Sequence, residues 1–303
     1  MLPEATILMA TYNGEKFLEK QLESISRQTG ITLRVYALDA GSTDRTISIF
    51  EDWIEKGLMI NYRIAAGSDP TKSFMVLLNE RRGDRFIFFA DQDDIWNQDK
   101  CKSMIDKHLE TNSDVVICDR LIIDEQGDVM VNQALRKITP SWNNALVENV
   151  AYGNCTMLTS KFATYVLSTA PPDKFLYDSW IYLVASLQKN ITSIDSKKVS
   201  YRIHSGNAIG VSGNFAFRRK FSGWNILTHQ VLSIKAEHLT QLTKREKESL
   251  MLYRNCFERF SFLNLIRCTL QNPALRQSRF ESIVFKSVFP ILVILFLIRR
   301  KHQ

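Results

Sequence analysis

Short apolar runs alternate with stretches whose apolar positions recur every three to four residues in the first part of the chain. The runs predict buried strands, at Ala5–Ala10, Leu33–Leu38, Met59–Ile64 and Phe86–Phe89. The periodic stretches predict helices, at Glu15–Gln28, Thr43–Lys56, Ser73–Arg81 and about Gln98–Thr111. This alternation is typical of an α/β fold with a mostly parallel, Rossmann-like sheet, right-handed crossovers and helices on both faces.

The pattern changes after Cys118. We expect a hairpin over Ile122–Val131 that turns at 124–128. Further strands are predicted at Tyr152–Thr159 and Val199–His204, and further helices at Phe162–Leu167 and Ser179–Leu187. Beyond Gly213 the patterns are helical, at Trp224–Leu239 and Lys244–Asn264. The chain is therefore predicted to hold an α/β domain over residues 1–213 and a helical region over residues 214–303.

Charge separates the same two regions. Residues 1–213 hold 23 Lys and Arg against 27 Asp and Glu, a net charge of −4, whereas residues 214–303 hold 16 against 5, a net charge of +11. The basic region ends in the apolar run Val288–Ile298 followed by Arg299, Arg300 and Lys301. The run is shorter than the roughly 20 residues that span a bilayer, so it predicts contact with a membrane surface. A buried core helix is the alternative, and the apolar end disfavours nucleic-acid binding.

The five cysteines are scattered and include no Cys-x-x-Cys pair. This distribution disfavours a zinc ribbon or a disulfide framework and indicates a reducing compartment. The first residues show no basic segment followed by a long apolar core, so we expect no secretory signal. These observations together favour a cytoplasmic location.

Three carboxylates, those of Asp91, Asp93 and Asp94, lie within four positions directly after the apolar run Phe86–Phe89. Like charges this close disfavour ionisation, and Mg²⁺ or Mn²⁺ relieves the repulsion because these cations prefer oxygen ligands. Ligand sites of open α/β sheets lie beyond the carboxyl ends of strands. The cluster therefore predicts a metal that binds a phosphorylated substrate. The alternative is an acidic turn in which Asp94 or Asn97 caps the next helix.

Polar loops also follow the first two predicted strands. Asp39 can accept a hydrogen bond from a base imide, Thr11 can bind a base or ribose, and Tyr12 can stack on a ring. Gly41 permits a tight turn. Each loop alone is ordinary turn chemistry, but three such loops at one edge of a sheet indicate a nucleotide site.

Residues of about 5–210 resemble a family-2 glycosyltransferase of the GT-A fold. The motifs that carry the resemblance are Ala10–Gly14, Asp39–Asp44, Asp91–Trp96, Gly153–Thr156, Tyr177–Trp180 and Tyr201–His204. The third and last of these resemble a bacterial subgroup that builds surface polysaccharides and includes many rhamnosyltransferases.

The resemblance implies that Thr11, Tyr12 and Asp39 hold the nucleotide, and that Asp91 faces the ribose or the donor sugar. The family usually has a second aspartate where this chain has Ala40. If that carboxylate helps to hold the nucleotide, the affinity for the donor or the base preference differs here.

The resemblance also implies that Asp93 binds the metal that bridges the diphosphate, with Asp94 beside it. His204 occupies a position that can reach the metal or the diphosphate. Arg202 offers a forked donor set and is an alternative contact to the diphosphate.

Asp178 matches the catalytic base of the family, for which a plain helix N-cap is the alternative. Gly153, Asn154 and Thr156 are expected to line the acceptor side. Trp180 could stack on an acceptor sugar or belong to the core.

The reaction implied is an inverting, metal-dependent transfer of L-rhamnose from dTDP-rhamnose to a hydroxyl of a polyprenyl-linked saccharide. Its expected location is the cytoplasmic face of the bacterial inner membrane. A UDP-hexose donor is a close alternative. A sugar nucleotidyltransferase is disfavoured because the loop Thr11–Glu15 contains a single glycine and no basic residue. An inactive membrane scaffold has Ala40 as its only indication.

Overall fold

The computed structural model describes residues 2–81, 85–130, 135, 137–169, 175–206, 228–234, 242–258, 263, 266–267, 289–291 and 293–294. Its contacts divide the chain into two compact units. The first unit comprises Met1–Ile138, Ala151–Ala170 and Asn190–Ser212. The second comprises Thr139–Val150, Pro171–Lys189 and Gly213–Gln303. The contacts thus assign two segments before residue 213 to the second unit, which the sequence pattern did not predict.

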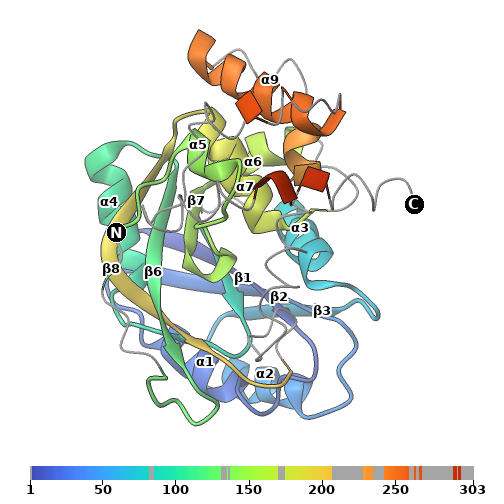
Figure 1. Ribbon diagram of the computed structural model, residues 1–303. Helices are drawn as coiled ribbons and strands as arrows, with labels where there is room; N and C mark the ends of the chain where they lie inside the picture. Colours follow the sequence, from blue (N-terminus) through green and yellow to red (C-terminus); the bar gives the residue numbers. More distant parts are fainter. Residues whose placement is uncertain are drawn as a thin grey trace. The chain divides into compact units, whose positions relative to one another are not determined.

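An eight-stranded sheet with the order β3-β2-β1-β4-β7-β6-β8-β5 forms the described part of the first unit (Figure 1). Its strands are β1 (Glu4–Thr11), β2 (Thr32–Asp39), β3 (Ile60–Ile64), β4 (Phe86–Asp91), β5 (Ile95–Trp96), β6 (Val115–Ile123), β7 (Thr156–Thr159) and β8 (Ile191–Arg202). The helices of this unit are α1 (Leu18–Ser26), α2 (Thr46–Glu55), α3 (Pro70–Glu80), α4 (Lys100–Thr111) and α6 (Ser160–Ser168), with the 3-10 turn η1 (Gly153–Cys155).

The predicted strand–helix alternation is confirmed for the first four strands, which pair in parallel. The chain moves outward from β1 to β3 and then returns to β4 on the other side of β1, so α1 and α2 cover one face and α3 covers the other. Ile7 accordingly packs in the cluster that contains Leu22. Phe89 on the opposite face meets Phe74 of α3, with ring centroids 5.7 Å apart.

The expected parallel pairing also joins β6 and β8 in the second half, but β7 pairs antiparallel with both β4 and β6, and β5 pairs antiparallel with β8. The sheet is therefore mixed. Strands buried on both faces read as continuous apolar runs, and such runs carry no local mark of strand direction.

Two boundaries in this half differ from the predictions. The strand expected over Tyr152–Thr159 begins only at Thr156, after η1. The last strand begins at Ile191 rather than Val199. The sequence did not predict this earlier start because the first residues of the strand are half-buried and show no clear alternation. The expected hairpin is confirmed over its described residues, since Ile123 and Val129 form an antiparallel bridge and the Met130 N–H donates to the Ile122 carbonyl at 3.1 Å.

The described part of the second unit is helical, with α5 (Trp142–Ala145), α7 (Tyr177–Leu187) and α9 (Lys244–Glu258). The Tyr182 hydroxyl of α7 donates a hydrogen bond to Asn144 Oδ1 of α5 at 2.7 Å. The helix expected over Trp224–Leu239 is described at 228–232, and its other positions lie largely outside the described residues.

Only part of the apolar run Val288–Ile298 is described. Phe289 is 2% exposed, and its ring lies 5.9 Å from that of Tyr253 on α9. Val293 is buried as well, whereas Ile291 and Ile294 are exposed. The buried positions fit the core-helix alternative. Among the described residues no helix has both the length and the apolar character needed to cross a membrane.

Candidate functional site

The loops after β1 and β2 are joined through Asp39. Asp39 is fully buried and accepts hydrogen bonds from the hydroxyls of Thr11 and Ser42 at 2.8 and 2.6 Å. Its second oxygen accepts from the N–H groups of Gly41 and Ser42 at 3.0 and 2.7 Å. Gly41 has a φ of +92°, which confirms the expected tight turn. The chain itself thus occupies both Asp39 oxygens, and the contact of Asp39 with a base stays a prediction.

Gln92 fastens the loop after β1 to the loop after β4, a role that sequence reasoning missed. Its side-chain amide accepts from the Tyr12 N–H at 2.8 Å and donates to the Tyr12 carbonyl at 3.0 Å. A Cβ at Gly14 would lie 2.5 Å from Gln92 Oε1, so a larger residue here would displace the Gln92 amide from its contacts with Tyr12. These contacts hold the Tyr12 backbone in place, while 59% of the residue remains exposed. That exposure suits stacking on a flat ring.

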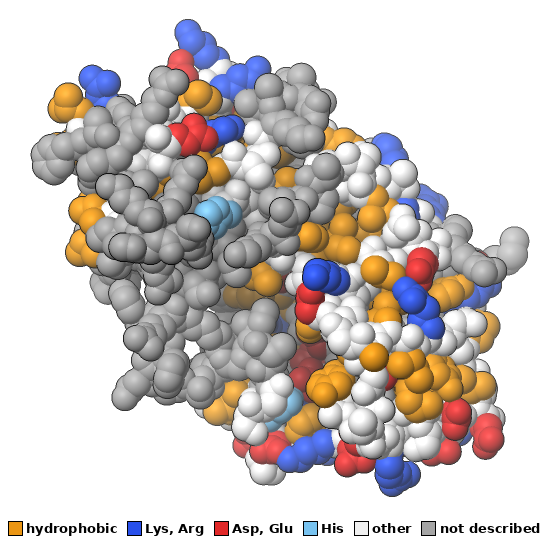
Figure 2. Space-filling model, turned by 90° about the vertical axis from the view of Figure 1, so that its right-hand side faces the viewer, with side chains coloured by type: hydrophobic (Ala, Val, Ile, Leu, Met, Phe, Trp, Pro, Cys, Tyr) orange, Lys and Arg blue, Asp and Glu red, His pale blue; other side chains and the backbone are white. Residues whose placement is uncertain are grey.

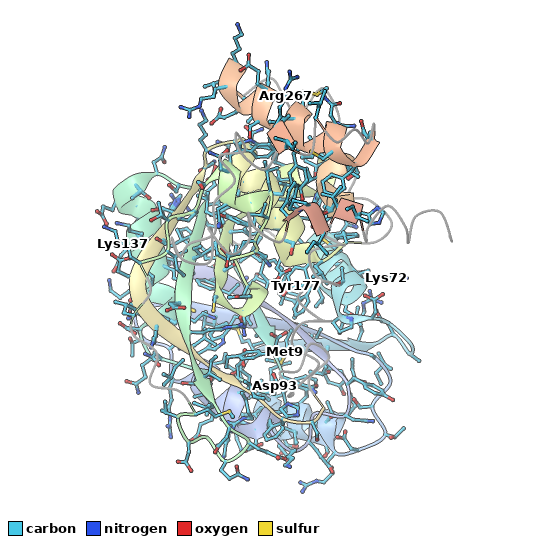
Figure 3. The ribbon with its side chains drawn as sticks, in the orientation of Figure 1. Met9, Lys72, Asp93, Lys137, Tyr177 and Arg267 are labelled. Atoms are coloured by element: carbon cyan, nitrogen blue, oxygen red, sulfur yellow. The ribbon has the colours of Figure 1, made fainter. Side chains whose placement is uncertain are left out.

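Asp93 and His204 meet at the carboxyl end of β4 (Asp93 is labelled in Figure 3). His204 Nε2 lies 2.9 Å from Asp93 Oδ2. The Gly206 N–H donates to His204 Nδ1 at 3.2 Å, so Nε2 is the ring nitrogen that faces the carboxylate. The Phe17 ring packs against the imidazole, with centroids 4.6 Å apart. The structure therefore brings together two predicted metal ligands that are separated by more than a hundred residues.

Asp94 lies behind this pair and is fully buried. It accepts hydrogen bonds from the side-chain amide of Asn154 and, at 3.3 Å, from the Arg202 N–H. Burial, reinforced by the charges of Asp91 and Asp93, raises the pKa of Asp94 well above its usual range. The repulsion expected from the acidic cluster is thus present, although Asp94 does not cap the next helix, whose N-cap is Asp99.

Lys100 is a second contributor that sequence reasoning missed. It is fully buried, donates to the Asn154 carbonyl at 2.6 Å and lies 3.1 Å from the centroid of the Trp96 ring. Burial lowers the pKa of its ammonium group. The burial of Lys100 could have been predicted from its spacing to Met104 and His108. Positions four residues apart share one face of a helix, and Met104 and His108 lie on the buried face of α4.

Arg202 is also fully buried, and its guanidinium donates to backbone carbonyls. The acceptors are the carbonyls of Asp93 at 3.0 Å, Asp124 at 3.1 Å and Glu125 at 2.8 Å. These bonds tie β8 to the acidic turn and to the loop after β6. The contact of Arg202 with a diphosphate stays a prediction, as does that of the half-buried Asp91 with the donor.

The three residues expected on the acceptor side lie in and next to η1. Gly153 and Thr156 are buried, and the Thr156 hydroxyl donates to the Tyr152 carbonyl at 2.8 Å. Asn154 is 2% exposed and bonded to Asp94. Asn154 thus supports Asp94, and contact of these three residues with an acceptor stays a prediction.

Asp178 and Trp180 belong to the second unit. Asp178 is half-buried in the first turn of α7, and its Oδ1 accepts from the Ser179 N–H at 2.6 Å. The helix N-cap is Leu176, so the N-cap alternative for Asp178 is wrong. Trp180 is 1% exposed, which fits its core alternative. The role of Asp178 as a base stays a prediction.

The residues around Asp93 fit a hard divalent cation. Mg²⁺ commonly takes one or two protein ligands and completes its shell with water and substrate phosphates. Asp93 supplies a carboxylate oxygen and His204 an imidazole nitrogen at the same point. Among the described residues no cluster of three or more His, Cys, Asp or Glu side chains forms a complete metal cage. A cation here would therefore depend on its substrate for further ligands.

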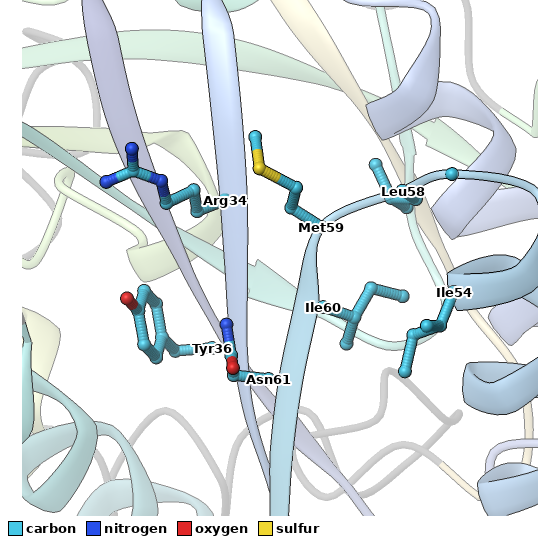
Figure 4. A pocket seen from close by; sticks show the side chains of 8 residues that line it. Arg34, Tyr36, Ile54, Leu58, Met59, Ile60 and Asn61 are labelled. Atoms are coloured by element: carbon cyan, nitrogen blue, oxygen red, sulfur yellow. The ribbon is translucent and has the colours of Figure 1, made fainter.

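A separate pocket of about 500 Å³ opens between β2 and β3 (Figure 4). Arg34, Tyr36, Met59 and Asn61 are among the residues that line it. Arg34 pairs with Thr6, five positions before the Thr11–Asp39 pair in the same ladder. The pocket thus lies toward the amino end of β2, away from the acidic cluster.

Comparison with known proteins gives a consistent result. The profile described as Glycosyl transferase family 2 matches residues 6–167. The chain is 28% identical over 226 residues to the dTDP-rhamnosyl transferase RfbG of Shigella flexneri, covering 70% of this chain and 76% of that protein. It is 27% identical to the UDP-Glc:alpha-D-GlcNAc-diphosphoundecaprenol beta-1,3-glucosyltransferase WfgD of Escherichia coli, covering 73% of this chain and 84% of that protein.

Solved structures show the same fold. The S. aureus TarS 1–349 complex with UDP-GlcNAc has a TM-score of 0.60 at 18% identity, covering 88% of this chain and 77% of that one. The mannosyltransferase PcManGT of Pyrobaculum calidifontis, in complex with GDP-Man and Mn²⁺, has a TM-score of 0.60 at 14% identity, covering 98% and 88%. The mixed sheet with flanking helices is thus the fold of these glycosyltransferases.

Proposed function

Because the chain belongs to glycosyl transferase family 2, we propose that it transfers a sugar from a nucleotide-sugar to a hydroxyl group during bacterial surface polysaccharide synthesis. L-rhamnose from dTDP-rhamnose is the first donor to test, since RfbG is a dTDP-rhamnosyl transferase. A UDP-hexose is the second, since WfgD is named for UDP-Glc. Both relatives are less than 30% identical, so the donor is a proposal.

The observation that carries the proposal is the convergence of Asp93 and His204 beside a buried, electrostatically disfavoured Asp94. Asp93 and His204 would hold Mg²⁺ or Mn²⁺ at this point. When bound, the cation supplies Lewis-acid stabilisation to the departing nucleoside diphosphate. Tyr12 would stack on the base from the neighbouring loop.

The acceptor hydroxyl is a poor nucleophile and needs a base for its proton. We assign this role to Asp178, whose carboxylate stays half-buried at the start of α7 rather than serving as its N-cap. The oxygen attacks the anomeric carbon, the bond to the diphosphate breaks, and the proton passes to Asp178. A single displacement of this kind inverts the anomeric configuration.

A polyprenyl-linked saccharide is the proposed acceptor, by analogy with the diphosphoundecaprenol substrate in the name of WfgD. Such an acceptor would keep the enzyme at the cytoplasmic membrane surface. The net charge of +11 in residues 214–303 supports attraction to anionic lipids. Co-sedimentation with anionic and neutral vesicles tests this part, and equal binding to both would contradict it.

The central test measures release of nucleoside diphosphate from dTDP-rhamnose and from UDP-hexoses, with a diphosphate-linked saccharide as acceptor. We expect turnover with Mn²⁺ or Mg²⁺ and a large loss after chelation. Asp178→Asn should abolish most turnover yet keep donor binding. Turnover that survives in Asp178→Asn removes Asp178 as the base, and a wild-type protein that consumes no donor refutes the proposed activity.

A further inference from the structure

Arg120 lies between two tyrosine rings that come from different parts of the chain. Its guanidinium carbon is 3.6 Å from the ring centroid of Tyr152 and 4.2 Å from that of Tyr201. Tyr152 directly precedes η1, and Tyr201 belongs to β8. Two aromatic contacts of this kind fix the plane of a guanidinium and cover its faces.

The strand register places Arg120 beside the acidic turn. Phe88 of β4 and Val116 of β6 both lie opposite Met157 of β7. Because β4 and β6 run in the same direction, Arg120 lies about level with Gln92, four residues beyond Phe88. The environment of Tyr201 agrees, since burial and then the Asp91, Asp94 and Asp93 charges raise its pKa to about 12 against the lowering effect of Arg120. Arg120 therefore faces the same edge as the candidate site.

The edge of the Arg120 guanidinium is not used within the described part of the chain, where no residue forms a hydrogen bond with it. Arg120 as a whole residue is half-buried. Arg202, by contrast, donates to three backbone carbonyls of its own chain. A guanidinium whose faces are covered by two rings and whose edge has no hydrogen-bond partner among the described residues suits a ligand that presents two oxygens in the plane of the fork.

The order of the strands indicates which substrate this ligand belongs to. The nucleotide-side loops follow β1 and β2, and the acidic turn follows β4. Arg120 is on β6, on the other side of β4 in the sheet. A donor that lies over the ends of β1, β2 and β4 would not extend to Arg120, so Arg120 is placed to contact the second substrate, the acceptor.

We propose that Arg120, held between Tyr152 and Tyr201, binds an oxyanion of the acceptor through its forked N–H groups. The phosphate of a diphosphate-linked acceptor and the carboxylate of an acidic sugar share this chemistry. The inference rests on the proposed transferase function, because it concerns the second substrate of the same site.

Steady-state kinetics of Arg120→Gln and Arg120→Lys provide the first test. With a diphosphate-linked acceptor, Arg120→Gln should raise the acceptor KM by about 10- to 100-fold and leave the donor KM unchanged, since hydrogen bonds to charged groups carry this much. Arg120→Lys should recover part of the loss because it keeps the charge without the fork. Arg34→Gln, at the other end of the sheet, is the matched control and should change neither KM.

Two acceptors separate the sources of the oxyanion. A dependence on Arg120 with the diphosphate-linked acceptor assigns the phosphate, and a dependence only with a uronic-acid glycoside assigns the carboxylate. An unchanged acceptor KM in Arg120→Gln overturns the proposal. Equal losses in donor and acceptor binding, with a melting temperature that falls in both Arg120 variants, also overturn it and leave Arg120 as a structural residue.

A binding measurement separates this inference from the proposed activity. Titration calorimetry with a short-chain prenyl diphosphate, in the presence of nucleoside diphosphate and Mn²⁺, needs no turnover. Binding that is present in the wild type and lost in Arg120→Gln supports the role of Arg120, even if no sugar is ever transferred. Equal binding by the wild type and by both variants rejects the phosphate as the ligand.

Discussion

Two buried aspartates at one edge of the sheet have opposite surroundings. Asp39, on the proposed nucleotide side, accepts four hydrogen bonds from its own loop and from Thr11. Asp94, on the proposed cation side, accepts two among the described residues and lies beside two further carboxylates. Equal burial therefore has different consequences. The first carboxylate is stabilised by its hydrogen-bond donors and organises a loop, whereas the second has an electrostatic cost that a bound cation would relieve.

Asp93→Asn gives the largest expected effect, because it removes a carboxylate from the cation side while keeping its shape. We expect kcat/KM to fall about a thousand-fold, equivalent to roughly 4 kcal/mol of transition-state stabilisation. The melting temperature should change little. Asp106→Asn, on the exposed face of α4, is the control and should retain wild-type turnover. Full activity in Asp93→Asn would remove the distinction between the two sides.

Asp39→Asn tests the structural side of the comparison. An amide places N–H groups where donors already point, so we expect a loss of about 2 kcal/mol of unfolding free energy. Urea denaturation measures this loss. Asp94→Asn should cost less or even stabilise the metal-free protein, because it removes an unfavourable buried charge. The reverse order of the two stabilities would contradict the comparison.

The effect of pH on the free energy of unfolding should have opposite signs for Asp44, on the proposed nucleotide side, and for Asp94, on the proposed cation side. Burial raises the pKa of Asp44, near Asp39, but hydrogen bonds from the Thr46 hydroxyl and from the Glu15 and Thr46 N–H groups outweigh it and lower the pKa. Its contribution is present above the unfolded pKa near 3.8 and is lost as the pH falls through the folded value. Asp44→Asn should flatten this acid loss.

Asp94 behaves oppositely because its folded pKa is raised. Without metal, the native state holds a proton that the unfolded state has released, so stability falls as the pH rises above about 4. Urea unfolding across a pH series in EDTA should show this fall in the wild type and not in Asp94→Asn. An identical pH profile for the two proteins contradicts the assigned environment.

Tyr12→Ala gives the smallest expected effect. Loss of an exposed stacking ring is worth about 1 kcal/mol, or roughly a five-fold rise in the donor KM. Tyr12→Phe keeps the ring and should stay near wild type. A larger effect of Tyr12→Phe than of Tyr12→Ala would show that the hydroxyl, not the ring, contacts the donor. Stability should be unaffected, since the Gln92 contacts use the Tyr12 backbone.

The described surface in Figure 2 mixes basic and acidic side chains. The basic excess of residues 214–303 falls largely on positions outside the described ranges. The vesicle co-sedimentation experiment is therefore the test of the predicted membrane contact. Within the apolar run, the described positions Phe289 and Val293 are buried. An apolar run has the same local sequence pattern whether protein or lipid covers it.

The local sequence determined the α/β class, the first four strands and the loops that follow them, because burial on both faces leaves apolar runs and turns leave polar residues and glycines. Only the tertiary structure decided the antiparallel place of β7, the burial of Lys100 under Trp96, the meeting of His204 with Asp93, and the position of Arg120 between Tyr152 and Tyr201. These features depend on packing between elements, including the register of strands that are distant in the chain, and no local periodicity records that packing.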